Sequence, residues 1–208
     1  MKELNNTYLY HVCDKKNLPS ILAKGGLTCK NQLTETDFTN IAHSTVQGSR
    51  SNKTVPQPPH GNLHDYVPFY FGAHSPMLFT IHKGNVIGCE SKQEDIIYLV
   101  TSWQKVLDDQ LEYVYTDGHG IMTFTEFYKD PEDRDAINWN YVEGRYWADD
   151  EEHPDRKRKK QAEFLVHQKV PLESILGIVC YSEAIKTEID ETLSSTGIET
   201  KVLKSWYY

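Results

Sequence analysis

Short apolar runs separated by polar turns characterise the chain and predict a mixture of strands and helices. Residues 7–12 are aromatic and β-branched, which is typical of a strand, and residues 17–24 have the pattern of a helix that ends at Gly25-Gly26. Residues 96–100 predict a buried strand, and residues 103–110 predict a short helix. These elements do not alternate regularly along the chain.

The remaining sequence contains further apolar segments and one long polar stretch. Strand-like or buried apolar segments are found at residues 66–71, 77–81, 113–116, 162–166 and 175–181. A helix through Ile185 and Ile189 is expected after the last of them. Residues 31–61 are polar and loop-rich, although apolar positions at helical spacing between 41 and 46 suit a short helix. No repeat and no flexible linker divides the chain, so residues 1–208 are expected to form a single domain.

Composition adds limits on the class of protein. Hydrophobic residues make up 38% and aromatic residues 12%, which predicts a folded chain. No apolar run approaches the roughly 20 residues of a membrane helix, and the N-terminus lacks a signal-peptide core, so a soluble, cytoplasmic protein without membrane contact is expected. The four cysteines, Cys13, Cys29, Cys89 and Cys180, are too widely spaced for a zinc motif, so free thiols and no bound metal are expected.

The net charge of −8 means that any contact with nucleic acid must be local. Residues 156–160 carry five consecutive positive charges, and Tyr141, Arg145, Tyr146 and Trp147 precede them. Rings that stack on bases, interleaved with cations that meet phosphates, are typical of a single-strand binding surface. A solvated basic face is the alternative, and the acidic residues at 149–152 count against phosphate binding unless they fold away.

Three side chains are candidates for chemistry. Glu163 stands at the mouth of an apolar strand and is either functional or an exposed carboxylate paired to one of the preceding cations. His11 ends the first strand, where it either lines a cleft or makes a structural hydrogen bond. Arg50 is either a phosphate clamp or an ordinary solvated arginine. The Walker A, GxGxxG, HExxH and GxSxG motifs are missing, which removes most support for the enzyme classes that use them.

Several blocks, in order, make the chain resemble the DarT family, the toxin half of a bacterial toxin–antitoxin system whose members ADP-ribosylate single-stranded DNA. The blocks are His11 with Asn17-Leu18, Ile21-Leu22 and Gly25-Gly26-Leu27; Ile41-Ala42-His43 before Arg50; residues 63–71 and Ser75-Pro76-Met77-Leu78; Thr116-Asp117-Gly118-His119; Arg145-Tyr146-Trp147; and Asp155-Arg156-Lys157-Arg158 before residues 161–166.

The resemblance implies an α+β ADP-ribosyltransferase fold, with two packed mixed β-sheets around an NAD cleft and flanking helices. It implies an NAD-dependent enzyme that transfers ADP-ribose to a base of single-stranded DNA and releases nicotinamide, with NAD as co-substrate and a macrodomain antitoxin of the DarG type as partner. Glu163 becomes the catalytic glutamate, because a carboxylate stabilises the ribose cation that forms when the nicotinamide bond breaks. Arg50 becomes the second catalytic residue.

The resemblance also implies the binding residues. Those expected to contact NAD are His11, Val12, Cys13, Ser20, Thr28, Arg50 and Tyr70. Those expected to contact DNA are His74, Ser75, Met77, His119, Arg145, Tyr146, Trp147, Arg156 and Arg158. His74 and Ser49 stand where the family commonly carries arginine, which leaves thymine and guanine both open as the modified base. A non-catalytic module that binds NAD and nucleic acid, and a transferase acting on RNA or protein, are the alternatives.

Overall fold

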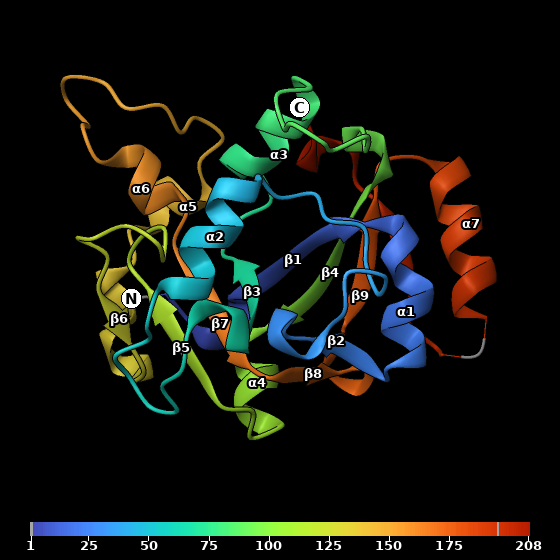
Figure 1. The fold of residues 1–208 in the computed structure, drawn as a ribbon, viewed down its shortest axis with the longest axis horizontal. Coiled ribbons are helices and arrows are strands. Elements are labelled where there is room, and N and C mark those ends of the chain that lie inside the picture. The colour runs from blue at the N-terminus through green and yellow to red at the C-terminus, as the bar shows by residue number, and fades with distance from the viewer. Residues whose placement is uncertain (1, 195) are drawn as a thin grey trace.

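The computed structural model describes residues 2–194 and 196–208, which form a mixed α+β structure (Figure 1). The strands are β1 (Tyr8–Asp14), β2 (Gly26–Thr28), β3 (Tyr66–Tyr70), β4 (Ile96–Ser102), β5 (Tyr113–Thr116), β6 (Phe127–Tyr128), β7 (Glu163–His167), β8 (Lys169–Pro171), β9 (Gly177–Cys180) and β10 (Thr200–Val202). The helices are α1 (Leu18–Ala23), α2 (Ser44–Asn52), α3 (Pro76–His82), α4 (Trp103–Asp108), α5 (Trp139–Glu143), α6 (Arg156–Lys160) and α7 (Glu183–Leu193).

The large sheet consists of two halves, β10-β9-β4-β1 and β3-β7-β5-β6, which meet at a single paired position. Its order is β10-β9-β4-β1-β3-β7-β5-β6, and β2 pairs with β8 in a separate small sheet. Strand β1 pairs with β4 from Tyr8 to Asp14, but it pairs with β3 only where Tyr10 faces Tyr70. The halves therefore diverge on either side of this position and leave room for a cleft between them.

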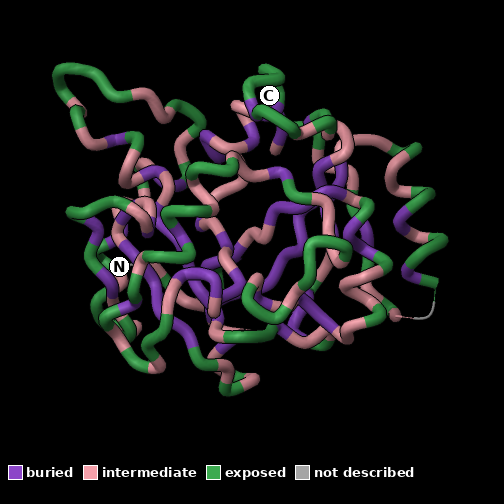
Figure 2. The backbone as a smooth tube through the Cα atoms, viewed as in Figure 1, coloured by how far each residue is buried: buried purple, intermediate pink, exposed green. Residues whose placement is uncertain are grey.

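The core lies between the sheet and the helices that cover it, as the buried segments in Figure 2 show. Every residue of β4 is buried, in agreement with its continuous apolar sequence and its position inside the sheet. The Trp103 ring lies at the centre of a cluster of aromatic contacts, 5.1 Å from the Phe164 ring centroid and 4.7 Å from that of Tyr115. This packing fixes β7, whose first residue is Glu163, against the rest of the sheet.

Most elements expected from the sequence are confirmed, and the strand-like interpretation of residues 77–81 is wrong. These residues belong to helix α3, in which Leu78 and Ile81 are buried. Ser75 caps the helix, since its hydroxyl accepts a hydrogen bond from the Leu78 N–H at 3.1 Å, and Pro76 occupies the first turn. The helix expected between 41 and 46 instead begins at Ser44 and extends to Asn52, which places Arg50 on its last turn.

Candidate active site

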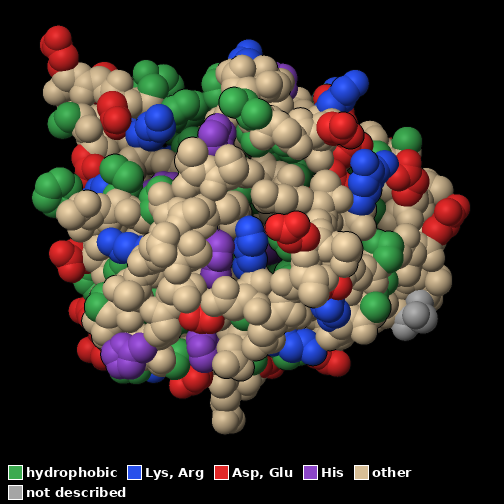
Figure 3. All heavy atoms as spheres, in the orientation of Figure 1, with side chains coloured by type: hydrophobic (Ala, Val, Ile, Leu, Met, Phe, Trp, Pro, Cys, Tyr) green, Lys and Arg blue, Asp and Glu red, His purple; other side chains and the backbone are tan. Residues whose placement is uncertain are grey.

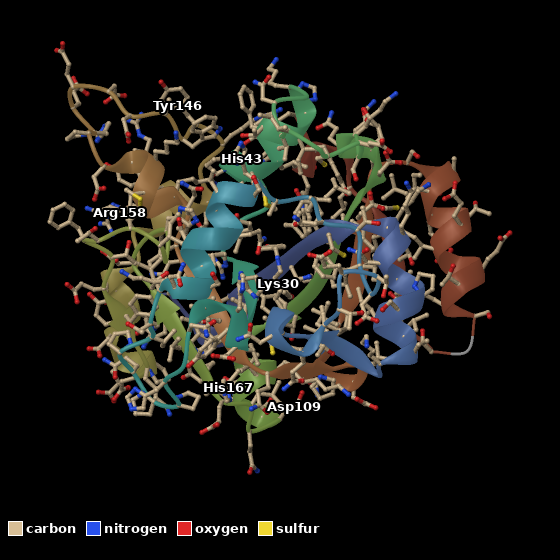
Figure 4. The ribbon with its side chains drawn as sticks, in the orientation of Figure 1. Lys30, His43, Asp109, Tyr146, Arg158 and His167 are labelled. Atoms are coloured by element: carbon tan, nitrogen blue, oxygen red, sulfur yellow. The ribbon has the colours of Figure 1, made fainter. Side chains whose placement is uncertain are left out.

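A cleft opens where the two halves of the sheet diverge, and it encloses about 1250 Å³ including its open mouth. Figure 3 shows a hollow near the middle of this face, and Figure 4 shows Lys30 beside it. All seven residues expected to contact NAD line the cleft, and so does Glu163. The lining of the cleft combines apolar side chains with a few polar and charged ones, as is typical of sites that bind a small molecule or cofactor.

Glu163 and Arg50 form a buried ion pair inside this cleft. Arg50 Nη1 donates to Glu163 Oε2 at 2.7 Å, although the residues are 113 positions apart. Glu163 is only 3% exposed, so the alternative of an exposed carboxylate paired to a neighbouring cation is wrong. Arg50 is also buried, at 8% exposed, and its Nη2 is buried without a hydrogen-bond partner among residues 2–194 and 196–208. A buried donor without a partner is costly, which favours a ligand that accepts a hydrogen bond there.

The second oxygen of Glu163 faces the turn after β5. The Gly120 N–H donates to Oε1 at 2.9 Å, and His119 Nε2 lies 3.8 Å from the same oxygen. Burial acts to raise the pKa of Glu163, but Arg50, His119 and the Gly120 N–H together hold it below its ordinary value. Burial lowers the pKa of His119 although Glu163 acts to raise it. At neutral pH the cleft thus contains a carboxylate beside a neutral imidazole.

His11 links the two halves of the sheet at the cleft. Its Nδ1 lies 2.8 Å from the Pro68 carbonyl oxygen. Because a carbonyl can only accept, Nδ1 carries the proton, and in the neutral ring Nε2 is an acceptor. Burial lowers the pKa of His11 to about 4, so the ring is neutral under ordinary conditions. This fixed orientation gives the cleft a hydrogen-bond acceptor suited to a hydroxyl or amide N–H of a ligand.

Tyr70 shares the sheet face of Glu163. The two residues lie opposite each other on β3 and β7, and Tyr10 lies opposite Tyr70 on β1, so the three side chains form a row. Burial raises the pKa of Tyr70, and the neighbouring Glu163 carboxylate raises it further. The phenol therefore keeps its proton and can act as a hydrogen-bond donor beside the ion pair.

The family model described as ssDNA thymidine ADP-ribosyltransferase, DarT, matches residues 10–208. The chain belongs to the DarT family. It is 37% identical over 206 residues to a DNA ADP-ribosyl transferase of Thermus sp. (strain 2.9), with 97% of this chain and 96% of the relative covered. The solved structure of Thermus sp. 2.9 DarT in complex with ADP-ribosylated ssDNA matches with a TM-score of 0.93 and 36% identity over the whole of both chains.

Two further matches extend the comparison. The Thermus sp. 2.9 DarT structure in complex with NAD+ has a TM-score of 0.87 and 35% identity, and the match covers 97% of this chain and 98% of that one. A Thermosipho africanus fusion of a DNA ADP-ribosyl transferase and a DNA ADP-ribosyl glycohydrolase is 22% identical over 192 residues, which cover 91% of this chain and 46% of the fusion. The expected α+β fold of the DarT family is confirmed.

Sequence reasoning missed part of the site of this DarT-family chain. The Gly120 N–H is a backbone group, which no residue type reveals. Gln47 on α2 also lines the cleft, where its Oε1 accepts from Lys30 Nζ at 3.0 Å and lies 3.0 Å from His64 Nε2. Burial, followed by the charges of Lys30 and Arg50, lowers the pKa of His64 to about 4. His64 was visible only as one residue of a family block, and no local pattern distinguished Gln47.

The residues expected to contact DNA are distributed around the cleft rather than gathered in it. Met77 and His119 line the cleft itself. Ser75 is buried as the cap of α3, and the His74 ring lies 5.4 Å from the Tyr208 ring. Arg145 lies over the same Tyr208 ring at 5.9 Å.

The other aromatic candidates lie on the segment between α5 and α6. The Trp147 ring lies 5.3 Å from the Phe79 ring on α3. Tyr146 is 63% exposed and points outward (Figure 4). The Arg156 guanidinium lies 4.9 Å from the Tyr146 ring and donates to the Asp150 carboxylate at 2.7 Å. The acidic stretch is therefore partly folded onto its neighbouring cations.

Among residues 2–194 and 196–208, no three His, Cys, Asp or Glu side chains are grouped so that they could hold a metal ion. Within the same ranges, each helix is too short or too polar to cross a membrane.

Proposed function

We propose that the chain transfers ADP-ribose from NAD+ to thymine in single-stranded DNA and releases nicotinamide, with Glu163 and Arg50 as its catalytic residues. The observation that carries the proposal is the buried Arg50–Glu163 pair inside a cleft of a DarT-family chain. The complexes of the Thermus sp. 2.9 relative with NAD+ and with ADP-ribosylated ssDNA support both substrates. The family description supports thymidine over guanine as the target.

The geometry suits cleavage of the nicotinamide–ribose bond. When that bond breaks, its electron pair moves to the nicotinamide nitrogen, and positive charge develops on the ribose ring. The Glu163 carboxylate, kept ionised by Arg50 and the Gly120 N–H, would accept hydrogen bonds from the ribose hydroxyls and stabilise that charge. The free Nη2 of Arg50 would donate to an oxygen of NAD.

The acceptor base completes the transfer. Thymine N3 forms the new bond to the ribose carbon and loses its proton. Arg50 cannot take that proton, because a guanidinium stays protonated. The neutral imidazole of His119 lies beside Glu163, and either group has a lone pair that can accept the proton. A base must be unstacked to reach this cleft, which favours single strands over duplex.

The test is to incubate the protein with NAD+ and single-stranded oligonucleotides that contain either thymine or guanine as the only reactive candidate. We expect a mass increase of one ADP-ribose on the thymine set, and Glu163→Ala should abolish it. Glu112→Ala is the matched control, because Glu112 is an exposed carboxylate at the end of the sheet. NAD+ binding without any adduct would indicate a non-catalytic module, and labelling of RNA or protein would indicate a different acceptor.

The proposed partner and setting follow from this activity. The Thermosipho africanus fusion joins a transferase to a glycohydrolase, which supports a macrodomain antitoxin of the DarG type that removes the modification made by this toxin. We propose that residues 1–208 act as one domain, since strands from Tyr8 to Val202 contribute to one sheet. We also propose the cytoplasm as its location, where NAD+ and DNA are both present.

A further inference from the structure

Arg158 lies on α6, and all the hydrogen-bond donors of its guanidinium group are engaged within the chain. Nε and Nη2 donate to the two oxygens of Asp155 at 2.8 and 2.7 Å. Nη1 and Nη2 donate to the two oxygens of Asp117 at 2.9 and 3.1 Å, and Nη1 also donates to Thr125 Oγ1 at 3.2 Å. An arginine has five N–H donors, so Arg158 has none left for a DNA phosphate.

Arg158 also makes several contacts with the turn that follows β5, residues 117–120. Asp117 begins this turn, and the Arg158 carbonyl oxygen accepts from the His119 N–H at 3.0 Å. The hydroxyl of Thr125, which accepts from Arg158, donates to the His119 carbonyl oxygen at 2.8 Å. The guanidinium packs directly on Gly118, where an added Cβ would lie 2.5 Å from Nη1. The turn is thus built around the Arg158 side chain.

This turn carries the backbone donor that faces Glu163. The Gly120 N–H donates to Glu163 Oε1 at 2.9 Å. Thr116 joins the turn to the start of β7, since its Oγ1 donates to the Gly118 carbonyl oxygen at 2.7 Å and accepts from the Glu163 N–H at 2.9 Å. A displacement of the turn would therefore move the donor away from the carboxylate.

We infer that Arg158 is a positioning residue for Glu163, which acts through Asp117 and the backbone of residues 118–120 to hold the Gly120 N–H against the carboxylate. The resemblance to the family implied that Arg158 contacts a DNA phosphate instead. The two roles differ in measurable ways, because a phosphate contact contributes to DNA affinity, whereas the positioning role contributes to the chemical step.

The experiment uses Arg158→Lys and Arg158→Gln in steady-state labelling of a thymine oligonucleotide. Lysine keeps the charge but cannot span two carboxylates, so both variants should lose kcat by roughly 10- to 100-fold, as expected when catalytic groups are misplaced. The KM for the oligonucleotide and the salt dependence of its binding should stay near those of the parent protein. The acidic limb of the kcat profile should move to higher pH, because the Gly120 N–H lowers the pKa of Glu163.

Two further variants separate the contacts of Arg158. Asp117→Asn weakens the link to the turn and should reproduce the loss of kcat. Asp155→Asn is the matched control, because Asp155 holds the same guanidinium but lies outside the turn, so most of the activity should remain. Thermal melting and NAD+ binding show whether each variant is folded. If Arg158→Gln does not fold, Arg158→Lys and Asp117→Asn still test the positioning role.

The outcomes are distinct from those that test the proposed function, on which this role rests. The positioning role is overturned if Arg158→Lys and Asp117→Asn keep the parental kcat. It is also overturned if Arg158→Gln raises the oligonucleotide KM and reduces the salt slope by about 1, as loss of a phosphate contact would. Failure of the parent protein itself to label any oligonucleotide would instead overturn the proposed function.

Discussion

Arg50 and Glu163 are joined at 2.7 Å inside the cleft, and only one terminal nitrogen of Arg50 takes part in that contact. Nη1 donates to the carboxylate, whereas Nη2 is buried and has no partner in the part of the chain that the structure describes. Because a guanidinium can present two parallel donors, Arg50 can hold Glu163 and a ligand oxygen at the same time. The pair is thus suited both to keep the carboxylate ionised and to align NAD with it.

Arg50→Lys should separate these two functions, since lysine keeps the positive charge but loses the second fixed donor. We expect kcat/KM for NAD+ to fall at least roughly tenfold, because a hydrogen bond to a charged group is worth about 1.5–3 kcal/mol. Initial rates of oligonucleotide labelling at varied NAD+ measure this. Arg134→Lys is the control, because Arg134 donates to the backbone carbonyl groups of Lys2 and Pro131 and is not among the residues that line the cleft. Parental kinetics in Arg50→Lys would show that the free nitrogen has no ligand.

His11 should make stability depend on pH in a defined window. Its pKa is lowered to about 4 in the folded protein, against about 6.5 when unfolded, so the unfolded chain binds more protons between these values. The contribution of the neutral His11 ring to the free energy of unfolding is fully present above pH 6.5 and is lost as the pH falls towards 4. His11→Asn should reduce this loss by an amount on the order of a few kcal/mol. Urea unfolding at several pH values measures the free energy of unfolding. If it depends on pH in the same way in His11→Asn and in the parent protein, His11 is not the group responsible.

Tyr146 should contribute to DNA binding without affecting NAD+. The residue is 63% exposed, and the Arg156 guanidinium lies 4.9 Å from its ring, as expected of a surface on which a base can stack. Tyr146→Ala should weaken oligonucleotide binding about tenfold, since base stacking on a ring is worth roughly 1–3 kcal/mol. Fluorescence anisotropy with labelled oligonucleotide measures the change. Ile87→Ala removes a side chain that is 85% exposed elsewhere on the surface and should have no effect.

Gly120→Ala should reduce catalysis by crowding the carboxylate. A Cβ at this position would lie 3.2 Å from both Glu163 Oε1 and a methyl group of Leu63, and both neighbours are packed. We expect kcat to fall roughly 10- to 100-fold while the protein remains folded. Gly48→Ala on α2 is the matched control, because its Cβ would meet nothing within 4 Å. That variant should keep its activity and gain about 0.5–1 kcal/mol of stability from the helix.

The amino-acid sequence alone determined much of the secondary structure. The apolar run at 96–100 is a strand because its β-branched and aromatic residues suit a sheet buried on both faces, and the run Phe164-Leu165-Val166, which is buried in β7, has the same character. The order of the family blocks also identified Glu163, Arg50 and His11 as site residues, and the structure places all three in one cleft. The local pattern failed at residues 77–81, where Ser75 and Pro76 start a helix that the apolar run by itself did not reveal.

Only the tertiary structure decided which groups meet. The Arg50–Glu163 pair joins positions 113 residues apart, and its geometry depends on where the fold places the last turn of α2 relative to the start of β7. The role of Gly120 depends on its backbone N–H, and that of Arg158 depends on two carboxylates that occupy its donors. Periodicity along a chain reports which side chains are buried, but it carries no information on register between distant segments, and hydrogen-bond partners are fixed by that register.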